Sequence, residues 1–560
     1  MKTELDAAIE AAVKELFGVE VKVELTRPDE QFGDYATNVA LRLASKLDKP
    51  PREIAETLAQ HVKDRISHMK EVSVAGPGFL NITLIDEALL KLAESEPVQN
   101  YKGQQILVEF GDPNPLKAMH LGHLYTTVVG DAICRLFEVA GADVKRLSYH
   151  GDVGMHVAKA VWAIGEQISW DTDRLQDLEA DEIRIDGQKL TIKTVIGYLY
   201  AKGAQAYEEE GHAAEQIRAI NKSIYAKDQA DVNKIYDWGV KRSFAYFDLV
   251  FKELSVNYDK RYLESESSPI GLESVQKHLG KVFEKSEGAI VYKGEKKGLH
   301  TRVFVNSEGL PTYEAKDLGL TELKKRDFPN AGKSIIITAT EQTEYFRVML
   351  AALSEFDAEL AAKTVHMAHG FLSLTSGKMS SRTGKVHQAQ ELLDDTQEAV
   401  KQAYPDSKVQ CEVYLAAVKY TFLKNRIGGD IVFDVQESVT LEGNSGPYLQ
   451  YALARANSIL KKSQIPNPKS QIDSLEPDER SLLRKLGEYA ETVEKAVDEL
   501  MPHHIAIYLY ELAQKFNSFY EHNRVIGDAR EEIRLSLVQK YADTLKNGLE
   551  TLGVPAPESM

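Results

Sequence analysis

Apolar residues follow different spacings along the chain and divide it into three parts. Residues 1 to about 100 begin with helical patterns and end with a strand-like run, 72–85, that is interrupted by Gly76, Pro77 and Gly78. This pattern predicts a small N-terminal α/β domain over 1–100. The polar segment 97–103 predicts a linker to the next part.

The middle part predicts a parallel sheet. A short apolar run at 106–110 is followed by apolar residues at helical spacing from Leu124 to Val139, and then by a second strand-like run at 144–149. Strand, turn, helix and strand in this order make a βαβ unit, whose strands are parallel. The run 334–338 repeats the theme. We therefore expect a parallel sheet within 101–395, interrupted by a charged, largely helical insertion at about 165–300.

Strand patterns almost vanish after residue 395. Long amphipathic stretches dominate instead, at 411–426, 448–462 and 481–500. They predict a separate helical bundle over 396–560. The expected fold is therefore a multidomain α/β protein with an all-α C-terminal part.

Composition narrows the class of protein. The formal net charge is −17, so nucleic acid would have to be bound through local basic or aromatic patches. Cys134 and Cys411 form no CxxC pair, which argues against a disulfide scaffold or a cysteine-rich zinc site and fits a reducing cytoplasm. No long uncharged apolar stretch predicts a membrane span, and the N-terminal pattern carries acids throughout, as a folded helix does.

The segment 114–123, NPLKAMHLGH, lies at the predicted turn between the first sheet strand and its helix. Helix N-termini bind phosphates because free N–H groups and the helix dipole face them. His120 and His123, three residues apart, project from one face of the first turn and can donate hydrogen bonds to a phosphoryl group. Gly122 leaves room for a flat ring. Metal ligation or a capping turn are the alternatives for an isolated HxxH.

A second segment, 377–384 (GKMSSRTG), is small and basic. It suits a loop that closes on a polyphosphate, although a solvated basic turn has the same composition. Together the two segments resemble the HIGH and KMSK motifs of class I aminoacyl-tRNA synthetases, in the form HLGH at 120–123 and KMSSR at 378–382.

Further segments resemble arginyl-tRNA synthetases over nearly the whole chain. QFGDYATNVALRLASKL and GPGFLNI are similar to that family's N-terminal tRNA-binding domain. The other matching segments are VEFGDPNPLKAMHLGHL, YHGDVGMH, LPTYEAKDLG, GKMSSRTGKV, EGNSGPYLQYALAR, FNSFYEHNRV and the terminal APESM. The resemblance implies a Rossmann-type catalytic domain. Two positions depart from it: Ser381 replaces the second KMSK lysine, whose charge Lys117 can supply, and Tyr125 stands where many relatives carry arginine.

The resemblance implies a set of site residues. An arginine pocket needs acceptors, because a guanidinium carries five N–H donors and a permanent charge. Glu341 competes with Gln342 for one pocket position. The implied catalytic residues are His120, His123, Lys117 and Lys378. The implied ATP-binding residues are Gly122, His120, His123, Lys378, Met379, Ser380 and Ser381. The implied arginine-binding residues are Glu109, Asn114, His120, Tyr313, Asp317 and Gln342.

Aromatic and amide side chains are the candidates for tRNA contacts. Phe79 and Asn81 follow a Gly-Pro-Gly turn, which we expect to present them outward to the tRNA elbow, although a phenylalanine is often a core residue. Tyr451 and Arg455 form an i, i+4 pair that can stack on anticodon bases, and Met560 at the chain end is implied to lie near the anticodon.

The implied reaction joins L-arginine to tRNA(Arg) through an arginyl-adenylate, releasing AMP and pyrophosphate. The resemblance implies ATP with Mg²⁺, no protein-bound metal or zinc, a monomer and a cytoplasmic location. Two alternatives remain: a non-catalytic tRNA-binding paralogue, which would be expected to lose the histidines or the lysine loop, and a smaller HxGH nucleotidyltransferase, which has no use for the terminal domains.

Overall fold

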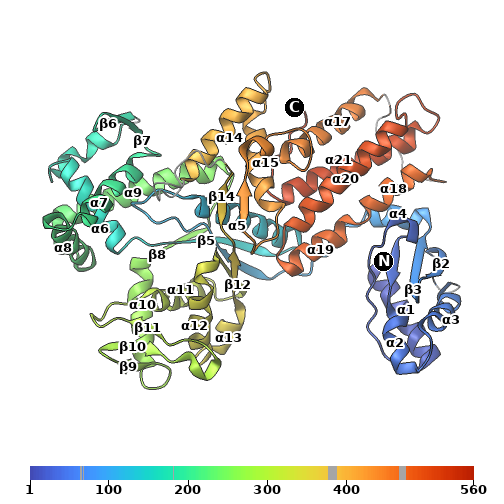
Figure 1. The fold of residues 1–560 in the computed structure, drawn as a ribbon, viewed down its shortest axis with the longest axis horizontal. Coiled ribbons are helices and arrows are strands. Elements are labelled where there is room, and N and C mark those ends of the chain that lie inside the picture. Colours follow the sequence, from blue (N-terminus) through green and yellow to red (C-terminus); the bar gives the residue numbers. More distant parts are fainter. Residues whose placement is uncertain (64–65, 67, 181, 376–387, 464, 466–473) are drawn as a thin grey trace.

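The structure of the chain is a computed structural model that describes residues 1–63, 66, 68–180, 182–375, 388–463, 465 and 474–560. Its N-terminal part is an antiparallel sheet of order β1-β3-β2 with helices packed on it (Figure 1). The elements are α1 (Lys2–Phe17), β1 (Tyr35–Thr37), α2 (Val39–Leu47), α3 (Pro51–Lys63), β2 (Met69–Ala75), β3 (Phe79–Leu84) and α4 (Asp86–Ala93).

A five-stranded parallel sheet of order β13-β12-β4-β5-β8 forms the centre of the molecule. β4 is the first strand of this sheet along the chain, and it has β5 on one side and β12 on the other. The strand order therefore reverses beside β4, as in a doubly wound Rossmann fold, where ligands bind at the point of reversal. The predicted Rossmann-type sheet is confirmed. Its strands are β4 (Gln105–Glu109), β5 (Asp143–His150), β8 (Lys260–Leu263), β12 (Ala331–Ala339) and β13 (Thr364–His369).

Helix α5 (Leu121–Val139) connects β4 to β5, as the apolar pattern predicts. The insertion that follows has its own apolar core, and it contains small antiparallel sheets besides the expected helices. Its elements are α6 (Met155–Gln167), β6 (Glu182–Ile185), β7 (Gln188–Thr191), α7 (Val195–Glu208), α8 (His212–Ala226) and α9 (Ala230–Glu253). After β8 come α10 (Glu264–Lys277), β9 (Glu284–Ser286), β10 (Ala289–Tyr292), β11 (Arg302–Val305), α11 (Tyr313–Asp327), α12 (Thr343–Ser354) and α13 (Ala358–Lys363).

The C-terminal part is helical, apart from β15 (Ile431–Phe433), which pairs in parallel with β14 (Leu372–Leu374). The expected boundary at 395 falls inside α14. The helices are α14 (Ala389–Ala403), α15 (Gln410–Leu423), α16 (Val435–Ser438), α17 (Gly446–Lys462), α18 (Pro477–Leu486), α19 (Tyr489–Glu499), α20 (His503–His522) and α21 (Glu531–Thr551). Within the described part of the chain, no helix has the length and apolarity needed to cross a membrane.

The amphipathic stretch expected at 481–500 is helical, but it is divided between α18 and α19, with a break at Gly487. A Cβ on this residue would lie 3.0 Å from Cβ of Leu92, so α4 of the N-terminal part approaches the backbone here. The Gly487 carbonyl also accepts a hydrogen bond from Arg27 at 3.3 Å. The break therefore results from docking of the N-terminal part, which periodicity along one segment does not reveal.

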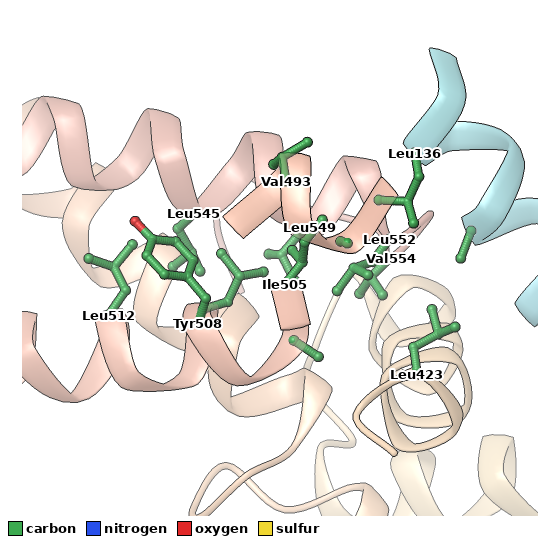
Figure 2. Close-up of a cluster of buried hydrophobic side chains, with 14 of the residues drawn as sticks. Leu136, Leu423, Val493, Ile505, Tyr508, Leu512, Leu545, Leu549, Leu552 and Val554 are labelled. Atoms are coloured by element: carbon green, nitrogen blue, oxygen red, sulfur yellow. The ribbon is translucent and has the colours of Figure 1, made fainter. Parts of the chain in front are cut away.

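One apolar cluster joins the central sheet to the helical part (Figure 2). Leu136 of α5 packs toward side chains of α15, α19, α20 and α21 and of the C-terminal tail. The labelled members are Leu136, Leu423, Val493, Ile505, Tyr508, Leu512, Leu545, Leu549, Leu552 and Val554. Because α5 also begins at the HLGH segment, the cluster ties the helical part to the helix that carries the two histidines.

A buried ion cluster joins the N-terminal part to α18. The fully buried Asp34 carboxylate lies 2.8 Å from Arg480 Nη2 and 3.5 Å from Arg484 Nε, and it accepts the backbone N–H of Leu84 at 2.7 Å.

We expect Asp34→Asn to lower the free energy of unfolding by about 2 kcal/mol, because charge-assisted hydrogen bonds are lost in a buried place. Glu30→Gln at the same interface, where Glu30 pairs with the exposed Lys515, should cost less than about 1 kcal/mol. Urea unfolding measures both; equal losses would contradict the difference in burial.

Candidate active site

The carboxyl ends of the parallel strands bring the candidate residues to one edge of the sheet. Glu109 ends β4, His150 ends β5 and His369 ends β13. The connection from β4 to α5 crosses this edge, and it contains Asn114, Lys117 and His120. This is the position beside the strand-order reversal where a doubly wound sheet binds its ligand.

Four hydrogen bonds hold the connection between β4 and α5 in place. Leu116 has a positive φ of 62° although its side chain is fully buried, so its backbone needs support. His150 is also buried; Ser148 donates to its Nε2, and burial lowers its pKa to about 4. The bonds are Tyr149 N–H to Asp112 Oδ1 (2.7 Å), His150 Nδ1–H to the Pro113 carbonyl (2.7 Å), Gly151 N–H to Asn114 Oδ1 (2.9 Å) and Leu116 N–H to Ser243 Oγ (2.8 Å).

His120 and His123 form a stacked pair at the start of α5. Their ring centroids are 3.6 Å apart and the planes differ by 20°. The His123 N–H faces His120 Nδ1 at 3.4 Å and the His120 N–H faces His123 Nδ1 at 3.3 Å, a reciprocal cap. A Cβ on Gly122 would lie 3.0 Å from the His120 ring, so glycine permits the stack. The expected shared face of the two histidines is confirmed.

Both histidines are neutral at pH 7. Burial, then Lys117 and His369, lowers the pKa of His120 to about 4; burial, then His120 and Lys117, lowers the pKa of His123 well below its ordinary value. Since each Nδ1 accepts a backbone N–H, the ring proton resides on Nε2. The turn thus supplies two neutral N–H donors held in fixed positions, which suits a phosphoryl group whose charge grows during reaction.

Lys117 lies close enough to both imidazoles to disfavour their protonation. Burial lowers the pKa of its own ammonium, whose nitrogen lies 5.7 Å from the Tyr200 ring centroid on α7. No carboxylate pairs with Lys117 among the described residues. Its charge is therefore available to a ligand at the histidine turn.

A buried group of carboxyls lies beside this turn. Asp317 on α11 accepts the Tyr345 hydroxyl of α12 at 2.6 Å, and Glu109 forms an ion pair with Lys324 of α11. Asp112, next to Glu109, has its pKa raised well above the ordinary value by burial and by the Glu109 charge. Carboxyls concentrated in this way favour a cationic ligand.

Asp317 carries a proton at neutral pH. Burial, with the charges of Glu109 of β4 and Glu264 of α10, raises its pKa to about 8, although the Tyr345 hydroxyl and Lys324 oppose the rise. A guanidinium placed against this carboxyl would favour its ionised form. Binding of such a cation therefore expels a proton.

The remaining arginine candidates lie around this group. Tyr313 begins α11 and is exposed, with Lys316 Nζ 5.3 Å from its ring; Lys316 in turn pairs with the buried Glu264 at 2.6 Å. Glu341 and Gln342 are both exposed in a short turn directly after β12, and no contact among the described residues distinguishes them. One edge of the sheet is therefore surrounded by Asn114, Tyr313, Asp317 and the turn after β12.

Other residues that the sequence analysis named lie outside the described part of the chain or in the protein core. Lys378, Met379, Ser380 and Ser381 lie outside the described residues. Tyr125 is fully buried, with its ring edge-on to His369 at 4.9 Å and to Phe422 at 5.5 Å. It packs in the core behind the histidine turn.

The outward orientation expected for two N-terminal residues is confirmed for Phe79, which is 40% exposed, and wrong for Asn81, which is 5% exposed. Asn81 lies within the central strand, paired with Ala36 of β1 and Ser73 of β2, whereas Phe79 begins that strand. The strand extends past the turn, so the turn exposes only its first residue. The proposed tRNA role of both stays a prediction.

The anticodon candidates lie together on α17 and the C-terminal tail. Tyr451 is exposed, and the Arg455 guanidinium lies 4.7 Å from the Tyr520 ring centroid. Asn457 donates to the Glu558 carbonyl at 3.2 Å, which holds the tail that ends in the exposed Met560 along this helix.

The sequence analysis did not identify four polar residues that lie around the buried carboxyls of Glu109 and Asp317. Asp112 and Tyr149 belong to motifs that the analysis recognised, but it did not name them as site residues. Tyr345 and Lys324 lie in segments from which the sequence analysis named no such residue. A signal for Lys324 existed, because it lies two helical turns after Asp317 and therefore on the same face of α11.

Family models match the chain from end to end. The arginyl-tRNA synthetase N-terminal domain matches residues 1–84, the catalytic domain of class I (R) tRNA synthetases matches 84–435, and the DALR anticodon-binding domain matches 449–560. An arginine–tRNA ligase of Limosilactobacillus reuteri is 30% identical, with all of both chains covered, and one of Thermobifida fusca is 30% identical over 100% of this chain and 99% of its own. The solved Thermus thermophilus arginyl-tRNA synthetase is similar with a TM-score of 0.81, 28% identity and complete coverage of both chains.

Proposed function

Because the chain belongs to the arginyl-tRNA synthetase family, we propose that it is an arginine–tRNA ligase whose active site is the sheet edge described above. The observation that carries this proposal is the neighbourhood of two neutral imidazole donors and a buried group of carboxyls at the strand-order reversal. The first suits the phosphates of ATP, and the second suits a guanidinium. Both substrates of the activation step would then meet at one edge.

The proposed first step forms arginyl-adenylate. An oxygen of the arginine carboxylate attacks the α-phosphorus of ATP, a new O–P bond forms, and the bond to the leaving pyrophosphate breaks. The Nε2–H groups of His120 and His123 and the ammonium of Lys117 stabilise the growing phosphoryl charge, with Lys378 from the segment 377–384. Mg²⁺ enters on the ATP phosphates. A ribose hydroxyl of tRNA(Arg) then attacks the activated carbonyl and releases AMP.

The proposed division of labour follows the three parts of the chain. Residues 1–100 contact the tRNA elbow through Phe79, 101–395 perform the chemistry, and 396–560 bind the anticodon through Tyr451, Arg455 and Met560. Of these, Phe79, Tyr451 and Met560 are already exposed. We further propose a monomer that works in the cytoplasm.

Arginine recognition is expected to depend on pH through Asp317. The guanidinium stays charged at every accessible pH, but the Asp317 carboxyl is protonated below its pKa of about 8. Arginine KM should therefore fall as pH rises toward 8, by up to about tenfold per pH unit, and level off above it. ATP–pyrophosphate exchange between pH 6 and 9 measures this. A KM for arginine that is independent of pH would contradict the protonated pocket.

Lys117 is expected to replace the missing second KMSK lysine. Lys117→Met and Lys378→Met should each slow adenylate formation by about 10- to 100-fold, since both remove positive charge from the same phosphates. The double variant should lose less than the product of the two single effects. Lys202→Met, which removes an exposed lysine of α7, is the control. Independent effects in single-turnover kinetics would place Lys117 away from the phosphates.

The proposal as a whole is tested by ATP–pyrophosphate exchange with arginine, in the presence and absence of tRNA. We expect exchange with arginine and none with citrulline, which lacks the charge, or lysine, which lacks the planar fork. Exchange with lysine at a similar rate would contradict the arginine pocket. Tight tRNA binding without any exchange would favour the non-catalytic paralogue.

A further inference from the structure

Lys324 is a buried cation on the same face of α11 as Asp317. Its ammonium forms an ion pair with Glu109 at the end of β4, and the two side chains are only 4% and 3% exposed. Among the described residues, neither Lys324 Nζ nor Glu109 Oε2 has a hydrogen-bond partner. Each of the two charges therefore depends on the other for compensation.

The Lys324–Glu109 ion pair gives the two carboxyls of Glu109 and Asp317 different charge compensation. Glu109 is already neutralised by a residue of the chain itself. Among the residues that the structure describes, Asp317 has only the Tyr345 hydroxyl, a neutral donor, at hydrogen-bond distance, and burial favours its protonated form until a cation arrives. An entering guanidinium thus finds one carboxyl occupied and another ready to ionise.

We infer that Lys324 is a positioning residue for arginine: by holding Glu109 in an internal ion pair, it leaves Asp317 as the carboxylate that receives the guanidinium charge. This inference rests on the proposed function. Without Lys324, an unpaired carboxylate at the end of β4 competes for the guanidinium and draws it away from Asp317. The carboxylate end of arginine then no longer meets the α-phosphorus in the required geometry.

The volume of the Lys324 side chain determines which substitution gives the clearer test. It lines a cavity of about 100 Å³ between α11, α13 and the amino end of β12, which has room for water. Alanine would connect this cavity to Glu109 and let water solvate the carboxylate. Methionine fills most of the same volume and removes only the charge, so Lys324→Met is the sharper variant.

The test is a double-mutant cycle on kcat/KM for arginine in ATP–pyrophosphate exchange. Lys324→Met and Glu109→Gln each leave one buried group without its partner, and each should lower kcat/KM for arginine by about 100-fold. The double variant, a neutral pair of similar size, should recover at least about tenfold over Lys324→Met. Lys324→Arg keeps the charge and should stay within about tenfold of the unchanged chain. KM for ATP should change little throughout.

Two results would overturn the inference. Unchanged or tighter arginine binding in Lys324→Met would show that Glu109 needs no internal partner. A double variant that is no better than Lys324→Met would show that Lys324 acts by packing alone. If Lys324→Met fails to fold, the double variant and Lys324→Arg are compared with the unchanged chain instead. A kcat/KM for arginine within about tenfold of that chain in both supports the inference, and a loss of about 100-fold in the double variant overturns it. Failure of the unchanged chain to activate arginine would refute the proposed function instead, and is therefore distinguishable.

Discussion

Replacing Asp317 by asparagine is expected to lower kcat/KM for arginine by about 10²–10³, while KM for ATP stays nearly unchanged. The amide is neutral and donates on one side, so one guanidinium N–H loses its acceptor and the charge pairing disappears; breaking a buried pair commonly costs about 3–5 kcal/mol. The fold should tolerate the change, because the pKa of Asp317 is about 8 and its carboxyl is therefore uncharged at pH 7.

The matched control is Asp327→Asn at the other end of α11, where the carboxylate pairs with Lys260 at 3.1 Å near the amino ends of the strands. Arginine kinetics of this variant should stay near those of the unchanged chain. Asp317→Asn should also abolish the dependence of arginine KM on pH. A loss confined to ATP would instead place Asp317 on the nucleotide side.

Two substitutions of His123 separate its role in capping α5 from its role as a hydrogen-bond donor to the phosphate. Asparagine places an acceptor near the position of Nδ1 and can keep the cap of α5, but it lacks the distal donor. We expect His123→Asn to lower the rate of adenylate formation by about 10²–10³ with little change in unfolding, since removal of one preorganised donor costs about 2.7–4 kcal/mol.

Glutamine provides the matched comparison at this position. Its amide reaches toward the position of Nε2, so His123→Gln should retain more activity than His123→Asn while losing more stability through the weakened cap. Single-turnover kinetics and thermal unfolding of both variants give the two readouts. Normal adenylate formation in His123→Asn would remove the second imidazole from the phosphate site.

Local patterns were enough to predict the elements that carry the chemistry. Short apolar runs predict β4, β5 and β12, and helical spacing predicts α5, because each of these elements is buried in the core. The spacing of His120 and His123 also predicts that they meet, since residues three apart share a helix face.

Contacts between distant segments could not be predicted in this way. The Glu109–Lys324 ion pair joins β4 to α11 across more than two hundred residues. The position of Lys324 on the Asp317 face of α11 does not indicate that its partner is Glu109. The break at Gly487 and the burial of Asn81 likewise depend on neighbours that only the folded chain supplies. Family resemblance named the residues around the pocket, but it did not reveal which of their charges were already paired.

The most direct test of the account is a charging assay in which total tRNA is offered with each of the twenty amino acids and ATP. The central claim is that one edge of the sheet joins a phosphate site to a guanidinium pocket. It predicts that arginine alone is transferred to tRNA, and that the product disappears when Asp317 is replaced by asparagine. Transfer of a different amino acid, or arginine transfer that is indifferent to Asp317→Asn, would contradict it.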